Sequence, residues 1–125
     1  MQMTIVSTSN APQAIGPYSQ AIIHNGLIYT SGQIALKPDG SFLDGDITAQ
    51  TKQVLQNLKN VLEAAGSSLS GVIKTSVFLS DMDNFNELNA VYAQFFDNHK
   101  PARTTIAVKT LPKNALVEIE CIARV

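Results

Sequence analysis

Hydrophobic and polar residues alternate along the C-terminal part of the chain. Odd-numbered positions from 115 to 125 carry apolar residues or cysteine, whereas Glu118 and Glu120 occupy even positions. Side chains of a β-strand point alternately to the two faces of a sheet. The pattern therefore predicts a strand with one buried face, and it places the two carboxylates on the opposite face.

Another strand is predicted just before this one. The segment 104–108 is rich in β-branched residues, and residues 112–114 have the composition of a turn. Pro101 disfavours helix at the preceding residue, so Arg103 should begin the strand. Because Arg103 and Glu118 lie on consecutive strands, we expect them to meet at the same edge of the sheet, where they could bind a small anion.

The clearest hairpin signal is Asn25-Gly26. It separates two apolar runs, residues 18–24 and 27–30. Asparagine and glycine tolerate the positive φ angles that both central positions of a type I′ turn require. We therefore predict an antiparallel hairpin here, preceded by a short strand over residues 4–7.

Two stretches place apolar residues at helical spacing. Asp46 is a candidate N-cap for a helix over residues 47–65, which Gly66 should end in the C′ position. A second helix is predicted after Asp81 or Asp83, either of which could cap it, and it should end before the Lys-Pro pair at 100–101. Its apolar stripe comprises Phe85, Leu88, Val91, Tyr92, Phe95 and Phe96.

These elements predict an α+β fold, with about six strands in a mixed sheet and two helices packed on one face. We expect the helices to connect parallel neighbouring strands on the same side of the sheet. The other face would expose apolar residues such as Ile106 and Val108, so we predict a homo-oligomer that covers it. Residues 1–125 are expected to form a single domain.

Charge and composition disfavour several classes of partner. The chain has 125 residues and a formal net charge of −1, and it shows no run of basic residues that would attract nucleic acid. No apolar stretch is long enough to span a bilayer, and the N-terminus lacks the features of a secretory signal. We expect a cytoplasmic protein without a nucleic-acid or membrane partner.

Metal and cofactor sites are not predicted. His24 and His99 stand alone, without further ligands at metal-binding spacing. No glycine-rich phosphate loop or nucleophile elbow is present. The single cysteine, Cys121, lies on the apolar face of the last strand, so we expect a reduced thiol in the core.

A few residues remain as candidates for chemistry. Arg103 can hold a carboxylate through its planar guanidinium, Glu118 can orient or deprotonate water, and Ser31 can bind an amine or imine. Tyr18 and Gly32 belong to the same hairpin region, and a glycine beside a strand indicates a bulge or a close approach by a ligand. The alternative is that Arg103 forms a structural salt bridge with a glutamate of the last strand.

Three stretches resemble the signatures of the RidA (YjgF) family of reactive imine/enamine deaminases. They are Ala-Ile-Gly-Pro-Tyr-Ser-Gln at 14–20, Tyr-Thr-Ser-Gly-Gln-Ile at 29–34, and a third segment spread over residues 101–120. The third contains Pro-Ala-Arg, Leu-Pro-Lys and Val-Glu-Ile-Glu. The resemblance implies a chorismate-mutase-like fold, assembled as a homotrimer with active sites in the clefts between subunits.

The resemblance also implies roles for individual residues. Arg103 would bind the substrate carboxylate, and Glu118 would handle the hydrolytic water. The other residues implied to line the cleft are Tyr18, Ser31, Gly32, Asn89 and Thr105. The implied reaction hydrolyses 2-iminobutanoate or 2-iminopropanoate, the tautomer of 2-aminoacrylate, to a 2-keto acid and ammonia. These reactive intermediates come from pyridoxal-phosphate enzymes, and the deaminase itself needs no cofactor.

The chain departs from the family pattern directly after the arginine. Many members carry Ser and then Cys there, whereas this chain has Thr104 and Thr105. Imine hydrolysis does not require a nucleophilic sulfur, so we expect activity to survive. Sensitivity of the site to thiol oxidants should not carry over.

Two other functions stay open. The cleft could bind small 2-keto acids without turnover, which would make the protein a sensor. Parts of the family have also been described as endoribonucleases or translation inhibitors, which the nearly neutral charge disfavours. The sequence does not fix the side chain of the preferred imine, its physiological source, any protein partner, or which subunit supplies each cleft residue.

Overall fold

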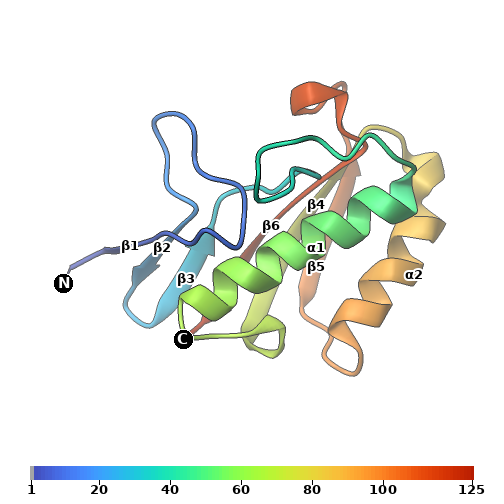
Figure 1. Cartoon of the computed structure of the whole chain (residues 1–125). Helices are drawn as coiled ribbons and strands as arrows, with labels where there is room; N and C mark the ends of the chain where they lie inside the picture. The colour runs from blue at the N-terminus through green and yellow to red at the C-terminus, as the bar shows by residue number, and fades with distance from the viewer. Residues whose placement is uncertain (1) are drawn as a thin grey trace.

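The computed structural model describes residues 2–125 (Figure 1). Its strands are β1 (Thr4–Val6), β2 (Ala21–His24), β3 (Leu27–Thr30), β4 (Val72–Leu79), β5 (Ala102–Ala107) and β6 (Val117–Arg124). Its α-helices are α1 (Ile47–Ala64) and α2 (Phe85–Phe96). Short 3-10 turns cover Leu69–Gly71, Met82–Asn84 and Pro112–Asn114. The predicted order of strands and helices is confirmed, although the extended run from 18 to 24 becomes a strand only at Ala21.

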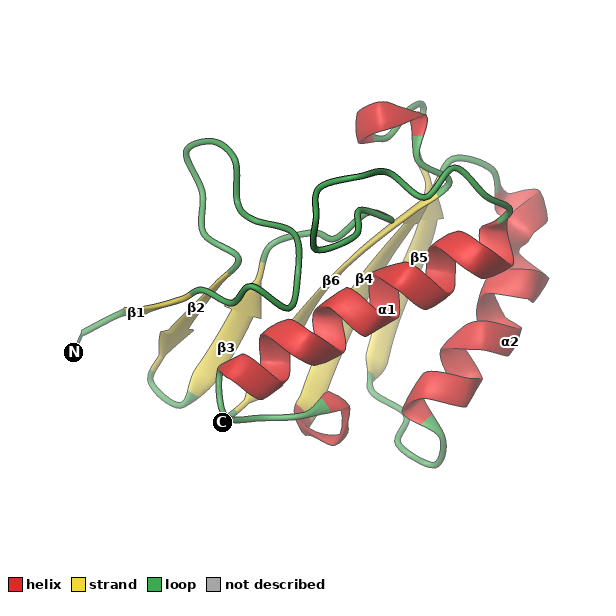
Figure 2. Cartoon of the chain, in the orientation of Figure 1, coloured by secondary structure: helices red, strands yellow, loops and turns green. Residues whose placement is uncertain are grey.

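The strands form one mixed sheet in the order β1-β2-β3-β6-β4-β5. The pair β4 and β5 is parallel, and the other neighbouring pairs are antiparallel. Helix α2 connects the parallel neighbours β4 and β5, as predicted. The same prediction is wrong for α1, because β6 inserts between β3 and β4 and pairs antiparallel with both. Both helices lie on one face of the sheet (Figure 2), which confirms the α+β class.

The helix and turn signals act largely as expected. Asp46 caps α1 by accepting a hydrogen bond from the Ala49 amide at 2.8 Å, and Gly66 follows the helix with φ +86°. The hairpin turn has positive φ at Asn25 and Gly26. The predicted cap of α2 needs correction. Asp81 caps the 3-10 turn before α2, accepting from the next-but-one amide, and the helix itself begins without a side-chain cap.

The main core lies between the sheet and the two helices. Strand β6 shows the predicted alternation, because its odd-numbered residues are buried in this core. Cys121 is one of them, and burial raises the pKa of its thiol to about 11. The largest fully buried side chains are Ile28, Leu55, Leu58, Leu62, Leu79, Leu88 and Ile119.

Two amides of α1 are buried, although the helical pattern gives no sign of it. Asn57 donates to the Leu36 carbonyl at 2.7 Å, and Gln50 accepts from the Leu116 amide at 2.9 Å. Both are almost inaccessible to solvent. A buried amide needs partners, so each of these side chains ties a loop to α1. Asn57 thereby positions the segment after β3 that borders the groove described below.

The other face of the sheet is uncovered within residues 2–125 (Figure 2). Ile106 and Tyr29 on this face are 46% and 43% exposed, and Phe78 and Ile122 are partly exposed. Val108 lies just beyond β5 and is half-buried in a small apolar cluster at the end of the sheet. The predicted exposed apolar face is therefore present, and Ile106 represents it better than Val108.

Within residues 2–125 no helix combines the length and the apolar character that a membrane span requires. No group of three or more His, Cys, Asp or Glu residues in the same range could hold a metal ion.

Candidate active site

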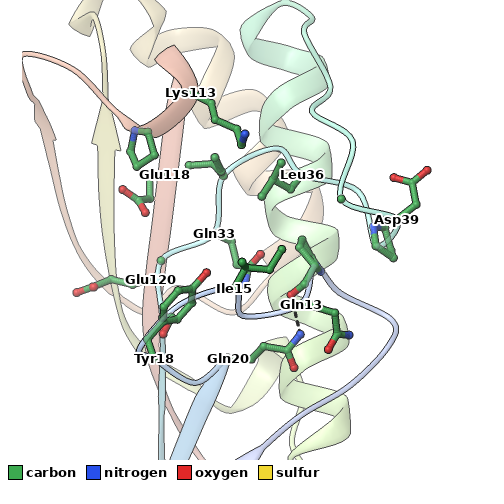
Figure 3. Close-up of a pocket in the computed structure, with 17 residues that line it drawn as sticks. Gln13, Ile15, Tyr18, Gln20, Gln33, Leu36, Asp39, Lys113, Glu118 and Glu120 are labelled. Atoms are coloured by element: carbon green, nitrogen blue, oxygen red, sulfur yellow. Dashed lines mark hydrogen bonds between the residues drawn. The ribbon is translucent and has the colours of Figure 1, made fainter.

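One group of candidate residues opens onto a groove of about 870 Å³ (Figure 3). Tyr18 comes from the loop before β2, Ser31 and Gly32 follow β3, and Glu118 comes from β6. We call these four residues the glutamate half-site. Figure 3 shows Glu118 and Tyr18 at one end of the groove and Asp39 at the other. Residues from loops 12–15, 36–40 and 112–113 also line the groove, and so do Gln20, Gln33, Ile34 and Glu120.

Ser31 ties the hairpin to the loop that carries Tyr18. Its hydroxyl donates to the Ser19 carbonyl at 2.5 Å, and its backbone N–H donates to the Gln20 carbonyl at 3.0 Å. The buried Gln20 side chain then holds the preceding loop: it accepts from the Thr8 amide at 2.7 Å and donates to the Pro12 carbonyl at 2.7 Å. The Ser31 and Gln20 side chains therefore hold the main chain on both sides of Tyr18.

Gly32 makes room for the carboxylate of Glu118. A Cβ atom at position 32 would lie 2.5 Å from Glu118 Oε2, so any other residue would displace the carboxylate. Burial raises the pKa of Glu118, and the nearby charge of Glu120 raises it further. Within residues 2–125 the Glu118 side chain makes no hydrogen bond or ion pair. The carboxylate therefore remains available to a water or a ligand.

A second group surrounds Arg103 on β5. Its Nη1 donates to Asn89 Oδ1 on α2 at 2.7 Å, and its guanidinium carbon lies 4.8 Å from the ring centre of Tyr92 and 5.5 Å from that of Phe85. We call Arg103, Asn89, Tyr92 and Phe85 the arginine half-site. A separate hollow of about 490 Å³ adjoins Arg103. Cation–π contacts and one amide fix the guanidinium, while its other N–H groups stay available for an anion.

Thr105 lies two residues beyond Arg103 on the same face of β5, where it pairs with Val77. Its hydroxyl is buried without a hydrogen-bond partner, although the residue as a whole is partly exposed. The accessible part is therefore the methyl group or the main chain. Thr105 is not among the residues that line either hollow.

The expectation that Arg103 and Glu118 meet at one sheet edge is wrong within a single chain. Arg103 is in register with Thr75 and Cys121, and these residues face the helix layer. Glu118 is in register with Phe78 on the open face. Strand β4 lies between β5 and β6, so the sheet separates the two side chains. The alternative salt bridge with a glutamate of β6 is not formed either, as Arg103 instead bonds to α2.

Comparisons with known proteins agree on the family. Residues 8–125 match the family model described as Endoribonuclease L-PSP. A Rid-family protein, YyfA from Yersinia pestis, has a solved structure that superposes with a TM-score of 0.97 at 48% identity, over 99% of this chain and 100% of that one. The chain belongs to the Rid family.

Two further Rid relatives carry more specific names. The Reactive Intermediate Deaminase A of Arabidopsis thaliana, a chloroplastic protein, is 47% identical over 95% of this chain and 64% of its own length. The structure of Escherichia coli TdcF with bound serine has a TM-score of 0.93 at 40% identity and covers 98% of both chains. The sequence resemblance to the RidA family is thus confirmed.

Sequence reasoning missed the aromatic partners of the arginine in this Rid protein. Tyr92 and Phe85 belong to the apolar stripe of α2, and core packing explains such a stripe without any ligand. The hydrogen bond between Tyr92 and the buried Thr75 at 2.8 Å gives no sequence signal either. The resemblance implies that Asn89 borders the cleft, and the structure shows that it contacts Arg103 directly.

Proposed function

We propose that this Rid protein hydrolyses small 2-imino acids, formed from enamines such as 2-aminoacrylate, to 2-keto acids and ammonia. The observation that carries the proposal is the pairing of a positioned cation with an unbonded, half-buried carboxylate on opposite faces of one sheet. The deaminase name of the Arabidopsis relative supports this reaction. The serine in the TdcF structure supports a ligand of amino-acid size.

Arg103 would bind the substrate carboxylate. One of its N–H groups is engaged by Asn89, and the flanking rings restrict how the guanidinium can turn. The remaining donors can grip a carboxylate in the bidentate manner that arginine favours. This contact would fix the position of the adjacent C=N carbon, and orientation supplies much of the catalysis in a reaction that proceeds slowly without enzyme.

Glu118 would activate the water. Its raised pKa makes the carboxylate a stronger base than an exposed glutamate, and Gly32 keeps space beside it. With the protonated imine as substrate, water adds to the imine carbon while Glu118 accepts a proton, giving a tetrahedral amino alcohol. Glu118 then returns this proton to the amino nitrogen, and the C–N bond breaks with release of ammonia. The hydroxyl proton passes to Glu118 or to solvent as the C=O bond of the 2-keto acid forms.

Because the half-sites lie on opposite faces, a complete site requires two chains. We propose a homotrimer in which the Arg103 face of one subunit meets the Glu118 face of the next. The exposed apolar residues of the open face, such as Ile106 and Ile122, are available for burial in such an assembly. The resemblance implies active sites in the clefts between subunits, and this arrangement adds which face of each subunit lines the cleft.

A coupled assay tests the activity. A serine or threonine dehydratase generates the imine, and the decay of the imine and appearance of keto acid are followed with and without this protein. We expect faster imine disappearance in proportion to protein concentration, with heat-denatured protein as the control. Keto-acid binding without any acceleration would favour the sensor function instead.

The name of the matching family model favours one second candidate, an endoribonuclease. The chain carries nine Lys and Arg residues against ten Asp and Glu residues, which gives little attraction for a phosphate backbone. Incubation of RNA with protein purified free of nuclease separates the candidates. Intact RNA together with imine turnover supports the deaminase, whereas cleavage that Glu118→Gln abolishes would support the nuclease.

A further inference from the structure

Ser31 uses both of its hydrogen-bond donors inside the protein. The backbone N–H donates to the Gln20 carbonyl at 3.0 Å, and the hydroxyl lies 2.5 Å from the Ser19 carbonyl oxygen. A carbonyl oxygen carries no proton, so the hydroxyl hydrogen must lie on the Ser31 side of this contact. The direction of the hydrogen bond therefore follows from chemistry alone.

Toward the groove, Ser31 can act only as an acceptor. Its oxygen keeps lone pairs after donating, and the residue lines the same groove as Glu118. Turning the hydroxyl toward a ligand would break its bond to the Ser19 carbonyl, which lies beside Tyr18 in the chain. Ser31 therefore remains an acceptor toward the groove as long as the loop that carries Tyr18 keeps its position.

We infer that Ser31 selects ligands that present an N–H, and that it thereby distinguishes the imine substrate from the keto-acid product. The inference rests on the proposed function and adds a specificity-determining residue to it. An imine or a protonated amine offers an N–H to the Ser31 oxygen. A 2-keto acid offers only a carbonyl oxygen at that place, and two acceptors that face each other leave a hydrogen bond unmade.

The consequence is weaker binding of product than of substrate. Both compounds share the carboxylate and the side chain, so Arg103 cannot tell them apart. Discrimination must come from the position at which the imine nitrogen of the substrate is replaced by the keto oxygen of the product. An acceptor-only residue at this position favours release of the keto acid once ammonia has left.

A matched pair of stable ligands tests the inference directly. We would measure dissociation constants of 2-aminobutanoate and 2-oxobutanoate by calorimetry, for the wild type and for Ser31→Ala. We expect the variant to bind 2-aminobutanoate about tenfold more weakly, since it loses one hydrogen bond to a charged donor, while 2-oxobutanoate changes by less than about twofold. Ser19→Ala is the control, because it keeps the carbonyl that Ser31 contacts.

The possible outcomes separate the roles of Ser31. An equal loss for both ligands would overturn the inference and assign Ser31 to holding the Tyr18 loop. A larger loss for 2-oxobutanoate would overturn it as well, by showing that Ser31 donates. Ser31→Cys preserves the size of the side chain, and its weak acceptor should reproduce the selective loss if Ser31→Ala fails to fold. The binding pair does not depend on turnover, so absence of deaminase activity would refute only the proposed reaction.

Discussion

The two half-sites differ in how the fold holds them. The arginine half-site is built on regular elements: Arg103 stands on β5, and its partner Asn89 stands on α2. The glutamate half-site combines one strand residue, Glu118, with loop residues such as Tyr18. The Ser31 and Gln20 side chains hold that loop by donating to its main-chain carbonyls. The first is rigid through packing, and the second is positioned through a network of polar contacts.

The two half-sites also differ in their electrostatics. Arg103 has an amide acceptor and two aromatic faces around its charge, so the cation is stabilised where it lies. Glu118 has a raised pKa because burial and Glu120 both disfavour its charge. One surface presents N–H donors that can bind an anion, and the other holds a carboxylate in a state that favours taking up a proton. Each surface lacks what the other supplies, so the function that we propose requires two copies of the chain.

The largest expected effect comes from keeping the copies apart. Ile106→Asp places a charge on the open face of the sheet, where we propose that subunits meet. A charge without a partner in a buried interface costs several kcal/mol, so the variant should be a monomer without deaminase activity. Light scattering measures the mass. Met82→Asp is the control, because this exposed residue lies in the 3-10 turn before α2 and not on the sheet. A trimeric, active Ile106→Asp protein would contradict the assembly.

A mixing experiment tests whether each site contains both half-sites from different chains. Arg103→Ala and Glu118→Gln should each be inactive or nearly so as pure proteins. After subunit exchange at equal concentrations, about a quarter of the sites in a cyclic trimer would combine an intact Arg103 with an intact Glu118 from the neighbour. Activity should therefore return to about a quarter of the wild-type value. If mixing restores nothing although subunits exchange, the site belongs to one chain.

The sequence predicts most residues of the two half-sites, but it does not predict that Arg103 and Glu118 lie on opposite faces of the sheet. Alternation within β6 placed Glu118 correctly opposite the core, because period-two patterning is a local property. The face of Arg103 relative to Glu118 depends on the register of β4, which pairs with both strands from a distant part of the sequence. Local patterns carry no information on such pairing, and the same reason explains the unexpected insertion of β6 between β3 and β4.

The sequence also does not predict which side chains anchor the loops. Gln50 and Asn57 occupy helix positions that a sequence pattern would assign to either surface or core, and their burial depends on carbonyl groups of loops far away in the chain. Chemistry and position in the sequence make Arg103, Glu118, Tyr18, Ser31 and Gly32 candidates, and the family resemblance adds Asn89 and Thr105. What the resemblance leaves open is the role of each contact, for which the hydrogen bonds are needed.

Replacing Glu118 by Gln should separate binding from chemistry. The amide keeps the shape but cannot accept the proton, so kcat should fall by about 10²-fold or more while keto-acid binding changes little. The same variant should be more stable at neutral pH. Folding raises the pKa of Glu118, so ionisation of this glutamate destabilises the protein. The gain in the variant should be complete above the folded-state pKa and should be lost as the pH falls from there to the ordinary pKa of a glutamate. Chemical denaturation at two pH values measures this, and unchanged kcat would refute the assigned role.

Glu120→Gln should have a smaller effect, and it tests the electrostatic difference between the two half-sites. The charge of Glu120 contributes to the raised pKa of Glu118, after burial. Removing it should lower that pKa, so the acidic limb of the kcat/KM profile should move to lower pH while the plateau stays within about twofold. Glu63→Gln on α1, which pairs with Lys59 on the surface, is a matched charge control. An acidic limb that does not move would show that another group limits activity.

The smallest effect concerns Thr105, which replaces the cysteine common in related sequences. Thr105 lines neither hollow of the single chain, but it shares a face of β5 with Arg103. We propose that its methyl group borders the site once a second subunit completes it, because its hydroxyl is buried without a partner. Valine has nearly the same shape and removes the unpaired hydroxyl, so Thr105→Val should raise the free energy of unfolding by about 1 kcal/mol. It should leave kcat/KM within about twofold, and Thr104→Val, at an exposed position that bonds to Lys74 at 3.0 Å, controls for a general effect of valine on this strand. A loss of activity of about tenfold in a folded, stabilised Thr105→Val protein would show instead that the hydroxyl turns toward the substrate and completes the arginine half-site.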